Sequence, residues 1–249
     1  MNKQDRIFTE AIGDVSDFDF GEKTAEVFDD MLDRSIPQYR ELLRMVGEIT
    51  GEFAENGTRL YDLGCSTGLT LASLHEATVA AGKNVSMVGV DYSQPMLDRA
   101  KERFGHLPES ERPHLVCADL NQGYATENAS VTVLNLTLQF IRPLYRDNLI
   151  RNIVSGLNDN GCLILVEKVL SDDTLLNRTF IKFYYDMKRR NGYTETEIAK
   201  KREALENVLI PYRMAENTEL LKRNGFAAVD TFFKWYNFCG ILAVKRCNA

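Results

Sequence analysis

The sequence predicts an α/β protein whose mostly parallel, seven-stranded sheet ends in an antiparallel hairpin. Short apolar segments alternate with helix-like segments up to about residue 168, a glycine-rich turn follows the first of them, and two adjoining strand-like segments meet near residue 236. Alternating strands and helices form right-handed parallel units, which bind ligands at the carboxyl ends of their strands.

The N-terminal part, to about residue 55, is expected to be a helical arm. Its first thirty residues or so are acidic and aromatic, which predicts a loose segment with short helical pieces. Ser35 and Pro37 are start signals for a helix, and Leu42, Leu43 and Val46 then fall on one helical face.

Five strands are expected in the central part, at residues 58–64, 85–93, 114–120, 129–141 and 160–168. Helices are expected between them at 69–83, after Pro95, and from Pro143 through Leu157. The fourth strand alternates poorly between apolar and polar residues, which is typical of a strand buried on both faces.

The pattern changes after Lys168. Residues 170–224 contain charged helical segments and no convincing strand, which predicts a helical insertion after the fifth strand. Residues 227–246 read as two strands joined tightly around Tyr236 and Asn237. We expect residues 1–249 to form a single domain.

Composition excludes several classes of function. The chain has 249 residues, 44% of them hydrophobic, and a net charge of −6, which argues against broad binding of nucleic acid through phosphates. Its five cysteines are scattered and odd in number, which predicts no zinc site and a reducing, cytoplasmic location. No signal peptide or membrane-spanning run is evident, so we expect no membrane binding.

The turn at residues 61–68, YDLGCSTG, permits two interpretations. It matches the G-x-S-x-G nucleophile elbow of serine hydrolases, and it also matches a glycine-rich turn that holds a nucleotide-like ligand. The hydrolase interpretation needs a histidine late in the chain, but His75, His106 and His114 all precede the fourth strand. Without a base, Ser66 would be a poor nucleophile.

Three aspartates at successive strand ends favour the ligand-binding turn. Asp62 precedes the turn, Asp91 can accept both hydroxyls of a ribose, and Asp119 is placed for an adenine amino group. Strand-end aspartates often only cap helices, but three beside one glycine turn favour binding. Leu69 occupies the position of the third glycine of a dinucleotide fold.

The spacing D-x-G-x-S-x-G and the terminal hairpin resemble class I S-adenosylmethionine (SAM)-dependent methyltransferases, which have a Rossmann-like fold. SAM has no pyrophosphate, so the turn need not bind an anion. Asp62 can offer negative charge near the ligand's ammonium and sulfonium.

A narrower resemblance covers nearly the whole chain. Several segments taken together resemble the carboxy-S-adenosyl-L-methionine synthase family: residues 34–39, 61–68, 90–97, 127–141, 188–211 and 221–226. The resemblance implies conversion of SAM and prephenate to carboxy-SAM and phenylpyruvate. Prephenate would lose carbon dioxide and hydroxide, the hydroxide would deprotonate the SAM methyl group, and the resulting ylide would capture the carbon dioxide. A partner tRNA carboxymethyltransferase would then use carboxy-SAM to form the wobble uridine cmo5U.

The resemblance assigns the catalytic cation to Arg202, which would pair with the new carboxylate from across a subunit boundary and so require a homodimer. Without the resemblance, the charge spacing of residues 200–206 is typical of an exposed helix. Lys201, Arg189, Arg190 and Arg213 are further candidate cations for the dianion prephenate, but each is better interpreted as a solvated charge.

The remaining binding residues also come from the resemblance. They are Tyr39 at the amino-acid end of the ligand, Gly64, Cys65 and Ser66 in the turn, Asp91 and Tyr92 at the ribose, Asp119 and Leu120 at the adenine, Asn135 after the fourth strand, and Arg202. Asn135 has support of its own, because an amide in a buried strand costs several kcal/mol without partners. No metal and no catalytic base are expected.

Three alternatives stay open. A conventional SAM-dependent methyltransferase acting on a small acid would use the same turn and aspartates. A SAM-binding regulatory protein would show the same polar groups without turnover. A dinucleotide oxidoreductase ranks lower because of Leu69 and the terminal hairpin.

Overall fold

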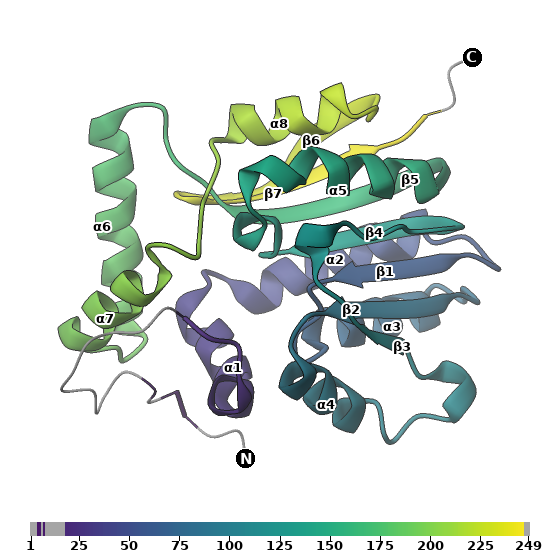
Figure 1. The fold of residues 1–249 in the computed structure, drawn as a ribbon, viewed down its shortest axis with the longest axis horizontal. Helices are drawn as coiled ribbons and strands as arrows, with labels where there is room; N and C mark the ends of the chain where they lie inside the picture. Colours follow the sequence, from purple (N-terminus) through teal and green to yellow (C-terminus); the bar gives the residue numbers. More distant parts are fainter. Residues whose placement is uncertain (1–3, 6, 8–17, 247–249) are drawn as a thin grey trace.

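The computed structural model describes residues 4, 5, 7 and 18–246. Its sheet has seven strands in the order β3-β2-β1-β4-β5-β7-β6 (Figure 1). The strands are β1 Arg59–Leu63, β2 Ser86–Asp91, β3 His114–Cys117, β4 Ala129–Asn135, β5 Leu157–Lys168, β6 Ala228–Trp235 and β7 Phe238–Val244. β1 to β5 pair in parallel, whereas β7 is antiparallel to both β5 and β6. The predicted sheet and terminal hairpin are confirmed.

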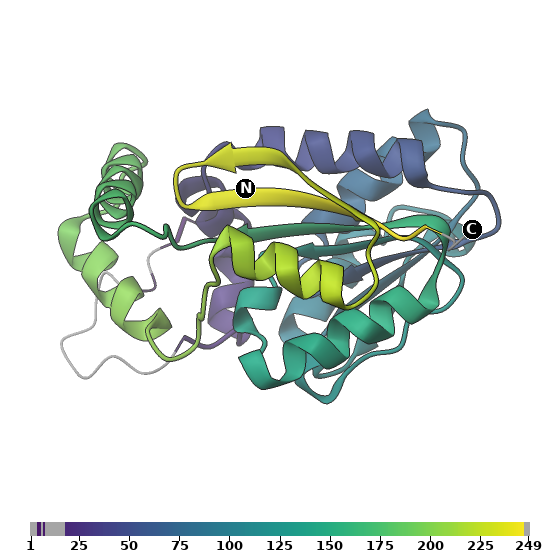
Figure 2. The same cartoon turned by 90° about the horizontal axis from the view of Figure 1, so that it is seen from above.

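Helices cover both faces of this sheet, as Figure 2 shows. The α-helices are α1 Glu22–Ser35, α2 Tyr39–Phe53, α3 Leu69–Ala80, α4 Gln94–Arg103, α5 Pro143–Gly156, α6 Thr174–Arg190, α7 Glu195–Leu205 and α8 Met214–Arg223. Short 3-10 helices occur at η1 Glu109–Glu111, η2 Leu120–Gln122 and η3 Leu138–Phe140.

Alternation along the strands divides the core into two layers. Leu60 of β1 packs in one cluster with residues of α2, α3 and α4, and its neighbour Tyr61 packs in the other with residues of α5 and α8. Successive side chains of a strand point to opposite faces, so a sheet covered on both faces buries all of them. β4 accordingly has six buried residues before Asn135.

The segment after β5 leaves the sheet and forms α6 and α7, which lie beyond the carboxyl ends of the strands, beside α1 (Figure 1). α8 then returns to the face that α5 covers. The three helices account for most of residues 174–223 of the predicted insertion, with connecting segments at 191–194 and 206–213. That the arm, the sheet and the insertion form one domain stays a prediction.

Three local predictions are wrong. β4 ends at Asn135 and not at Ile141, because Leu136 has a φ of 60° and residues 138–140 form η3. Ser35 ends α1 instead of starting the next helix, which begins at Tyr39 after Gln38 in the left-handed region. Residues 22–35 form one continuous helix and not short pieces. Most of the arm before residue 18 lies outside the described residues, as does Cys247.

Candidate functional site

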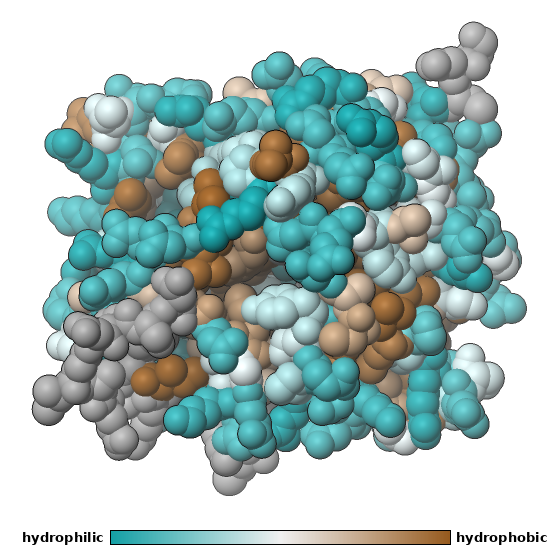
Figure 3. All heavy atoms as spheres, viewed as in Figure 1, coloured by the Kyte–Doolittle hydropathy of each residue, from teal (hydrophilic) through white to brown (hydrophobic). Residues whose placement is uncertain are grey.

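A cavity of about 200 Å³ lies at the carboxyl ends of β1, β2 and β4, between these strands and helices α1 and α2. Figure 3 shows apolar side chains around a hollow near the middle of this face. All nine binding residues that the sequence predicts besides Arg202 line the cavity: Tyr39, Gly64, Cys65, Ser66, Asp91, Tyr92, Asp119, Leu120 and Asn135. The structure thus brings together residues that are up to 96 positions apart in sequence (135 − 39).

The glycine turn brings bare backbone to the cavity wall. Gly64 has a φ of +86°, and a Cβ there would lie 2.3 Å from Thr137 Oγ1, so only glycine fits. Ser66 is also left-handed, with a φ of 49°, and its N–H donates to Asp91 Oδ2 at 2.9 Å. The turn therefore presents Ser66 through its backbone, in a conformation fixed by the carboxylate of β2.

Asp91 is a buried carboxylate held by backbone donors. It accepts from Ser66 N–H and from Ser93 N–H, each at 2.9 Å. Burial raises its pKa, and the bonds from the backbone lower it. Because its oxygens are fixed at the cavity, Asp91 can accept hydrogen bonds from neighbouring hydroxyls of a ligand.

Asp62 lies at the end of β1 and is completely buried, although it is not among the lining residues. Neither carboxylate oxygen makes a hydrogen bond of ordinary geometry to a residue that the structure describes. Burial and the charge of Asp91 raise its pKa to about 8, against a smaller lowering by the Leu71 backbone amide. A buried carboxyl group without a partner suits a nearby ligand that carries positive charge, as the ammonium and sulfonium of SAM do.

Asn135 lines the cavity with an unpaired amide oxygen. Its Nδ2 donates to Thr70 Oγ1 at 3.0 Å, while its Oδ1 has no hydrogen-bond partner among the described residues. Tyr39 is buried beside this pair, and its pKa is raised by burial and by the charge of Asp62. These groups leave an acceptor and a phenol at the cavity with capacity for a polar ligand.

The part of the cavity near Asp119 has an aromatic wall. Asp119 Oδ1 accepts from the backbone and side-chain nitrogens of Asn121, both at 2.9 Å, so it caps η2 while it also lines the cavity. Phe20 makes edge contacts with Tyr92 at 6.0 Å and with Phe140 at 5.3 Å between ring centroids. Sequence reasoning missed Phe20 and Phe140, which give this part a wall suited to a planar base.

Helix α1 is fastened over the glycine turn by polar contacts that sequence reasoning also missed. Asp29 accepts from Thr67 Oγ1 at 2.7 Å and pairs with Arg103 at 2.6 Å. Arg103 donates in turn to the Thr67 carbonyl at 2.8 Å. These contacts hold the helix that carries Phe28 and Met31 against the cavity.

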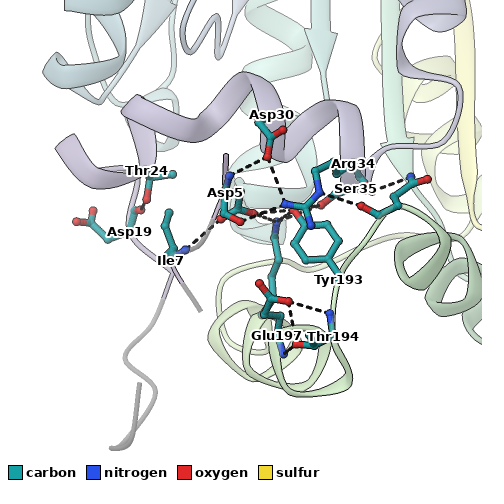
Figure 4. A network of polar contacts seen from close by, with 12 residues as sticks. Asp5, Ile7, Asp19, Thr24, Asp30, Arg34, Ser35, Tyr193, Thr194 and Glu197 are labelled. Atoms are coloured by element: carbon teal, nitrogen blue, oxygen red, sulfur yellow. Dashed lines mark hydrogen bonds and ion pairs between the residues drawn. The ribbon is translucent and has the colours of Figure 1, made fainter. Parts of the chain in front are cut away.

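The prediction that Lys201 is a solvated charge is wrong. Its side chain is 5% exposed, and its Nζ lies 3.6 Å from Asp5 and 3.1 Å from Ser35 Oγ. The partners Asp5, Ser35 and Tyr193 appear in Figure 4. Arg189 and Arg213, by contrast, form surface ion pairs with Glu195 and Asp172, as expected for solvated charges.

Arg202 is exposed and does not line this first cavity within one chain. It lines an adjoining cavity of about 220 Å³, which shares Lys168, Tyr184 and Lys201 with the first. An arginine in this place is open to solvent and to whatever packs against α7.

The described residues contain no group of three or more histidine, cysteine or carboxylate side chains placed to hold a metal ion. The four cysteines in the described part of the chain are free. No helix formed by these residues is both long and apolar enough to span a membrane.

Known proteins resemble the chain in sequence and in fold. Residues 61–163 match the family described as "Methyltransferase domain". A Methylococcus capsulatus protein named carboxy-S-adenosyl-L-methionine synthase is 55% identical over 97% of this chain and 99% of its own length. A protein of the same name from Desulfotalea psychrophila is 41% identical over 98% of each chain.

Solved structures show the same fold at low sequence identity. An O-methyltransferase family protein from Burkholderia thailandensis has a TM-score of 0.66 at 15% identity, covering 91% of this chain and 61% of that chain. Human N-acetylserotonin methyltransferase in complex with SAM has a TM-score of 0.57 at 14% identity, covering 90% and 55%. The chain thus spans less than two thirds of either solved protein, and the likeness shows the fold alone.

Proposed function

Because the chain belongs to the carboxy-S-adenosyl-L-methionine synthase family, we propose that it converts SAM and prephenate to carboxy-SAM and phenylpyruvate. The observation that carries this proposal is the 55% identity to one such synthase over 97% of the chain. In the reaction, prephenate gives up a carboxyl group as carbon dioxide, and its hydroxyl group leaves as hydroxide. The SAM methyl group exchanges one proton for the carboxyl group, and that proton and the hydroxide form water.

The cavity supports SAM as its ligand. Asp91 would accept the ribose hydroxyls, and Asp119 and Leu120 would lie at the adenine, beside the aromatic wall. The backbone of Gly64–Ser66, with Tyr39 and Asn135, would hold the amino-acid end. SAM supplies a methyl group on a sulfonium, and the unpaired carboxyl group of Asp62 favours that positive charge nearby.

The residues around the cavity suit a reaction whose base comes from the second substrate. No histidine occurs among the described residues that line it. Of the carboxylates that line it, Asp91 accepts from two backbone amides and Asp119 accepts from the backbone and side-chain nitrogens of Asn121. The protein would then act by placing the two substrates together and by excluding water.

Arg202 would pair with the carboxylate of the product from a neighbouring subunit, in a homodimer. Two observations support this assembly: Arg202 is exposed on α7 and does not line the SAM cavity of its own chain, and α6 exposes Leu175 to 71% and Leu176 to 48%. Exposed apolar side chains of this size favour burial against a second copy. Replacing Leu175 with Asp should convert the dimer to a monomer in light scattering, and an unchanged mass would refute this surface.

We further propose a cytoplasmic location and a functional link to a tRNA carboxymethyltransferase that uses carboxy-SAM. The net charge of −6 suggests that the partner enzyme, and not this chain, holds the tRNA.

Mass spectrometry of small molecules tests the activity. Purified protein incubated with SAM and prephenate should yield a SAM-derived species heavier by one carbon dioxide, and SAM alone should yield none. Arg202→Ala should lower the yield, whereas Arg223→Ala, an exposed arginine paired with Asp147 on α5, should not. Unchanged SAM would refute the synthase, and a methylated acid would establish the conventional methyltransferase instead.

A further inference from the structure

Three lysine side chains converge where the insertion meets the sheet. Lys168 ends β5, Lys188 lies in α6 and Lys201 lies in α7. The ammonium groups of Lys168 and Lys188 lie 5.1 Å and 5.4 Å from the ring centroid of Tyr184. Those of Lys188 and Lys201 lie 5.3 Å and 5.2 Å from the ring of Tyr193. Two aromatic rings therefore hold three cations in one small region.

The negative charge of this region does not match its positive charge. Lys201 pairs with Asp5, but no hydrogen bond or ion pair joins the ammonium of Lys168 or Lys188 to a described residue. Lys188 is only 4% exposed. A buried ammonium without an anionic partner costs several kcal/mol, and a ring face returns only part of that.

Nearby carboxylates are already engaged. Asp5 and Glu197 are the carboxylates whose negative charge raises the pKa of Lys188. Asp5 accepts a hydrogen bond from Tyr193 at 2.7 Å and pairs with Lys201. Glu197 accepts from the backbone and hydroxyl of Thr194, both at 2.8 Å, and so caps α7 (Figure 4). Glu206 also lines the second cavity, but no ion pair joins it to one of the three lysines among the described residues, so an additional anion would balance the cluster.

The acidity of the lysines agrees with this imbalance. Burial, followed by the charges of Lys201 and Lys168, lowers the pKa of Lys188 to about 7. Burial likewise lowers the pKa values of Lys168 and Lys201 to about 8, although Asp5 partly offsets the effect on Lys201. A bound anion would raise all three pKa values again.

The cluster lies at the junction of the two cavities. Lys168 and Lys201 line the cavity that carries the SAM-binding residues. All three lysines, together with Arg202, line the adjoining cavity of about 220 Å³. A molecule in this second cavity would thus lie between the SAM cavity and the exposed arginine.

We propose that Lys168, Lys188 and Lys201 bind the carboxylates of the carboxyl donor, a small molecule that carries two negative charges, in the second cavity. This inference rests on the proposed function, and it assigns the donor's site to residues of this chain. The lysines are binding residues here, and no bond to them forms or breaks. Lys168 and Lys201 border both cavities, so they place the donor beside SAM.

The sharpest test replaces Lys188 with Met, because Lys188 lines the second cavity and not the first. Methionine keeps the length of the side chain and removes the charge, so the fold should persist. Loss of one charge-assisted contact in a buried site should raise the KM for prephenate about 10- to 100-fold. The Kd for SAM, measured by calorimetry, should change less than about twofold. Lys188→Arg should restore most of the affinity, and Lys182→Met, an exposed lysine of the same helix, should have no effect.

The outcomes separate this inference from the proposed function. If the unmodified protein forms no carboxy-SAM from prephenate, the proposed function fails. If it does, and Lys188→Met and Lys168→Met both keep the original KM, only the lysine site is refuted. A weakened Kd for SAM with an unchanged KM for prephenate would also overturn it, because the lysines would then serve the carboxylate of SAM. Thermal unfolding establishes that each variant is folded.

Discussion

Asp62 gives the stability of the protein a pH dependence that can be worked out from the structure. Burial raises the pKa of Asp62 to about 8 in the folded protein, whereas an exposed aspartate has an ordinary pKa of 3.8. Between these two values, the folded protein binds a proton at Asp62 and the unfolded chain does not. Raising the pH from 4 to 8 therefore destabilises the fold, and the stability is lost as pH approaches the folded pKa.

The size of this pH dependence follows from the number of protons bound. One proton difference changes the free energy of unfolding by about 1.4 kcal/mol per pH unit, so Asp62 should contribute a loss of about 3 kcal/mol between pH 5 and pH 7. Asp62→Asn keeps the shape of the side chain and cannot ionise. The asparagine amide can lower stability at every pH, but this offset does not depend on pH, so the difference in slope isolates the carboxyl group.

Urea unfolding at pH 5, 6 and 7 measures this difference. The stability of Asp62→Asn relative to the original protein should rise by about 1.4 kcal/mol per pH unit. Asp147→Asn is the control, because the pKa of Asp147 is lowered to about 2 by Arg223 and its titration lies below this range. Parallel curves for Asp62→Asn and the original protein would refute a protonated Asp62.

The same reasoning predicts the linkage to SAM. A cationic ligand favours the charged form of Asp62, so SAM binding should release protons between pH 6 and pH 8. Calorimetry in two buffers of different ionisation enthalpy would detect that release. Asp62→Asn should abolish it and should weaken SAM binding about 10-fold. Equal proton release by the variant would show that another group titrates.

Other predictions concern the turn, the second buried carboxyl group and the lysines. Gly64→Ala should lower the stability of the turn by about 1–2 kcal/mol because of its left-handed backbone, and by more because the new Cβ would clash with Thr137. SAM affinity should therefore fall at least 10-fold in calorimetry. An unchanged Kd for SAM would refute the inference that only glycine fits at position 64. Burial raises the pKa of Glu167 to about 8, so this carboxyl group should also make the free energy of unfolding fall by about 1.4 kcal/mol per pH unit. Glu167→Gln should abolish this contribution in urea unfolding. The proton release on SAM binding should survive in that variant. The KM for prephenate should rise from pH 6 to pH 9 as Lys188, Lys168 and Lys201, with pKa values of about 7, 8 and 8, lose their protons, and Lys188→Met should reduce this rise.

The site residues that the sequence predicts correctly are those whose place in the site follows from their position along a strand. Asp91 ends β2 and Asp119 comes just after β3, and the fold itself brings the ends of parallel strands to one edge of the sheet. Gly64 is predictable because only glycine adopts its conformation against Thr137. In each case a local rule and the topology agree.

The parts that the sequence misses depend on contacts between distant segments. Lys201 has the charged neighbours of an exposed helix, and its burial follows from packing against Asp5, Ser35 and Tyr193. Periodicity within α7 carries no information about a partner 196 residues away (201 − 5). Phe20 joins the aromatic wall for the same reason, because its partner Phe140 lies on η3.

The position of β7 also has a consequence for how the chain is synthesised. β7 is the last strand made, yet it lies between β5 and β6 and completes the edge of the sheet next to β5. Until Val244 leaves the ribosome, the wholly apolar edge at residues 162–166 has no partner, for about 4–15 s at ordinary rates of translation. During that interval the nascent protein exposes an unpaired apolar strand edge, with which strands of other chains can pair. Premature termination just before residue 238 would therefore leave a polypeptide prone to aggregate, even though every residue of the SAM cavity except Phe238 had been made.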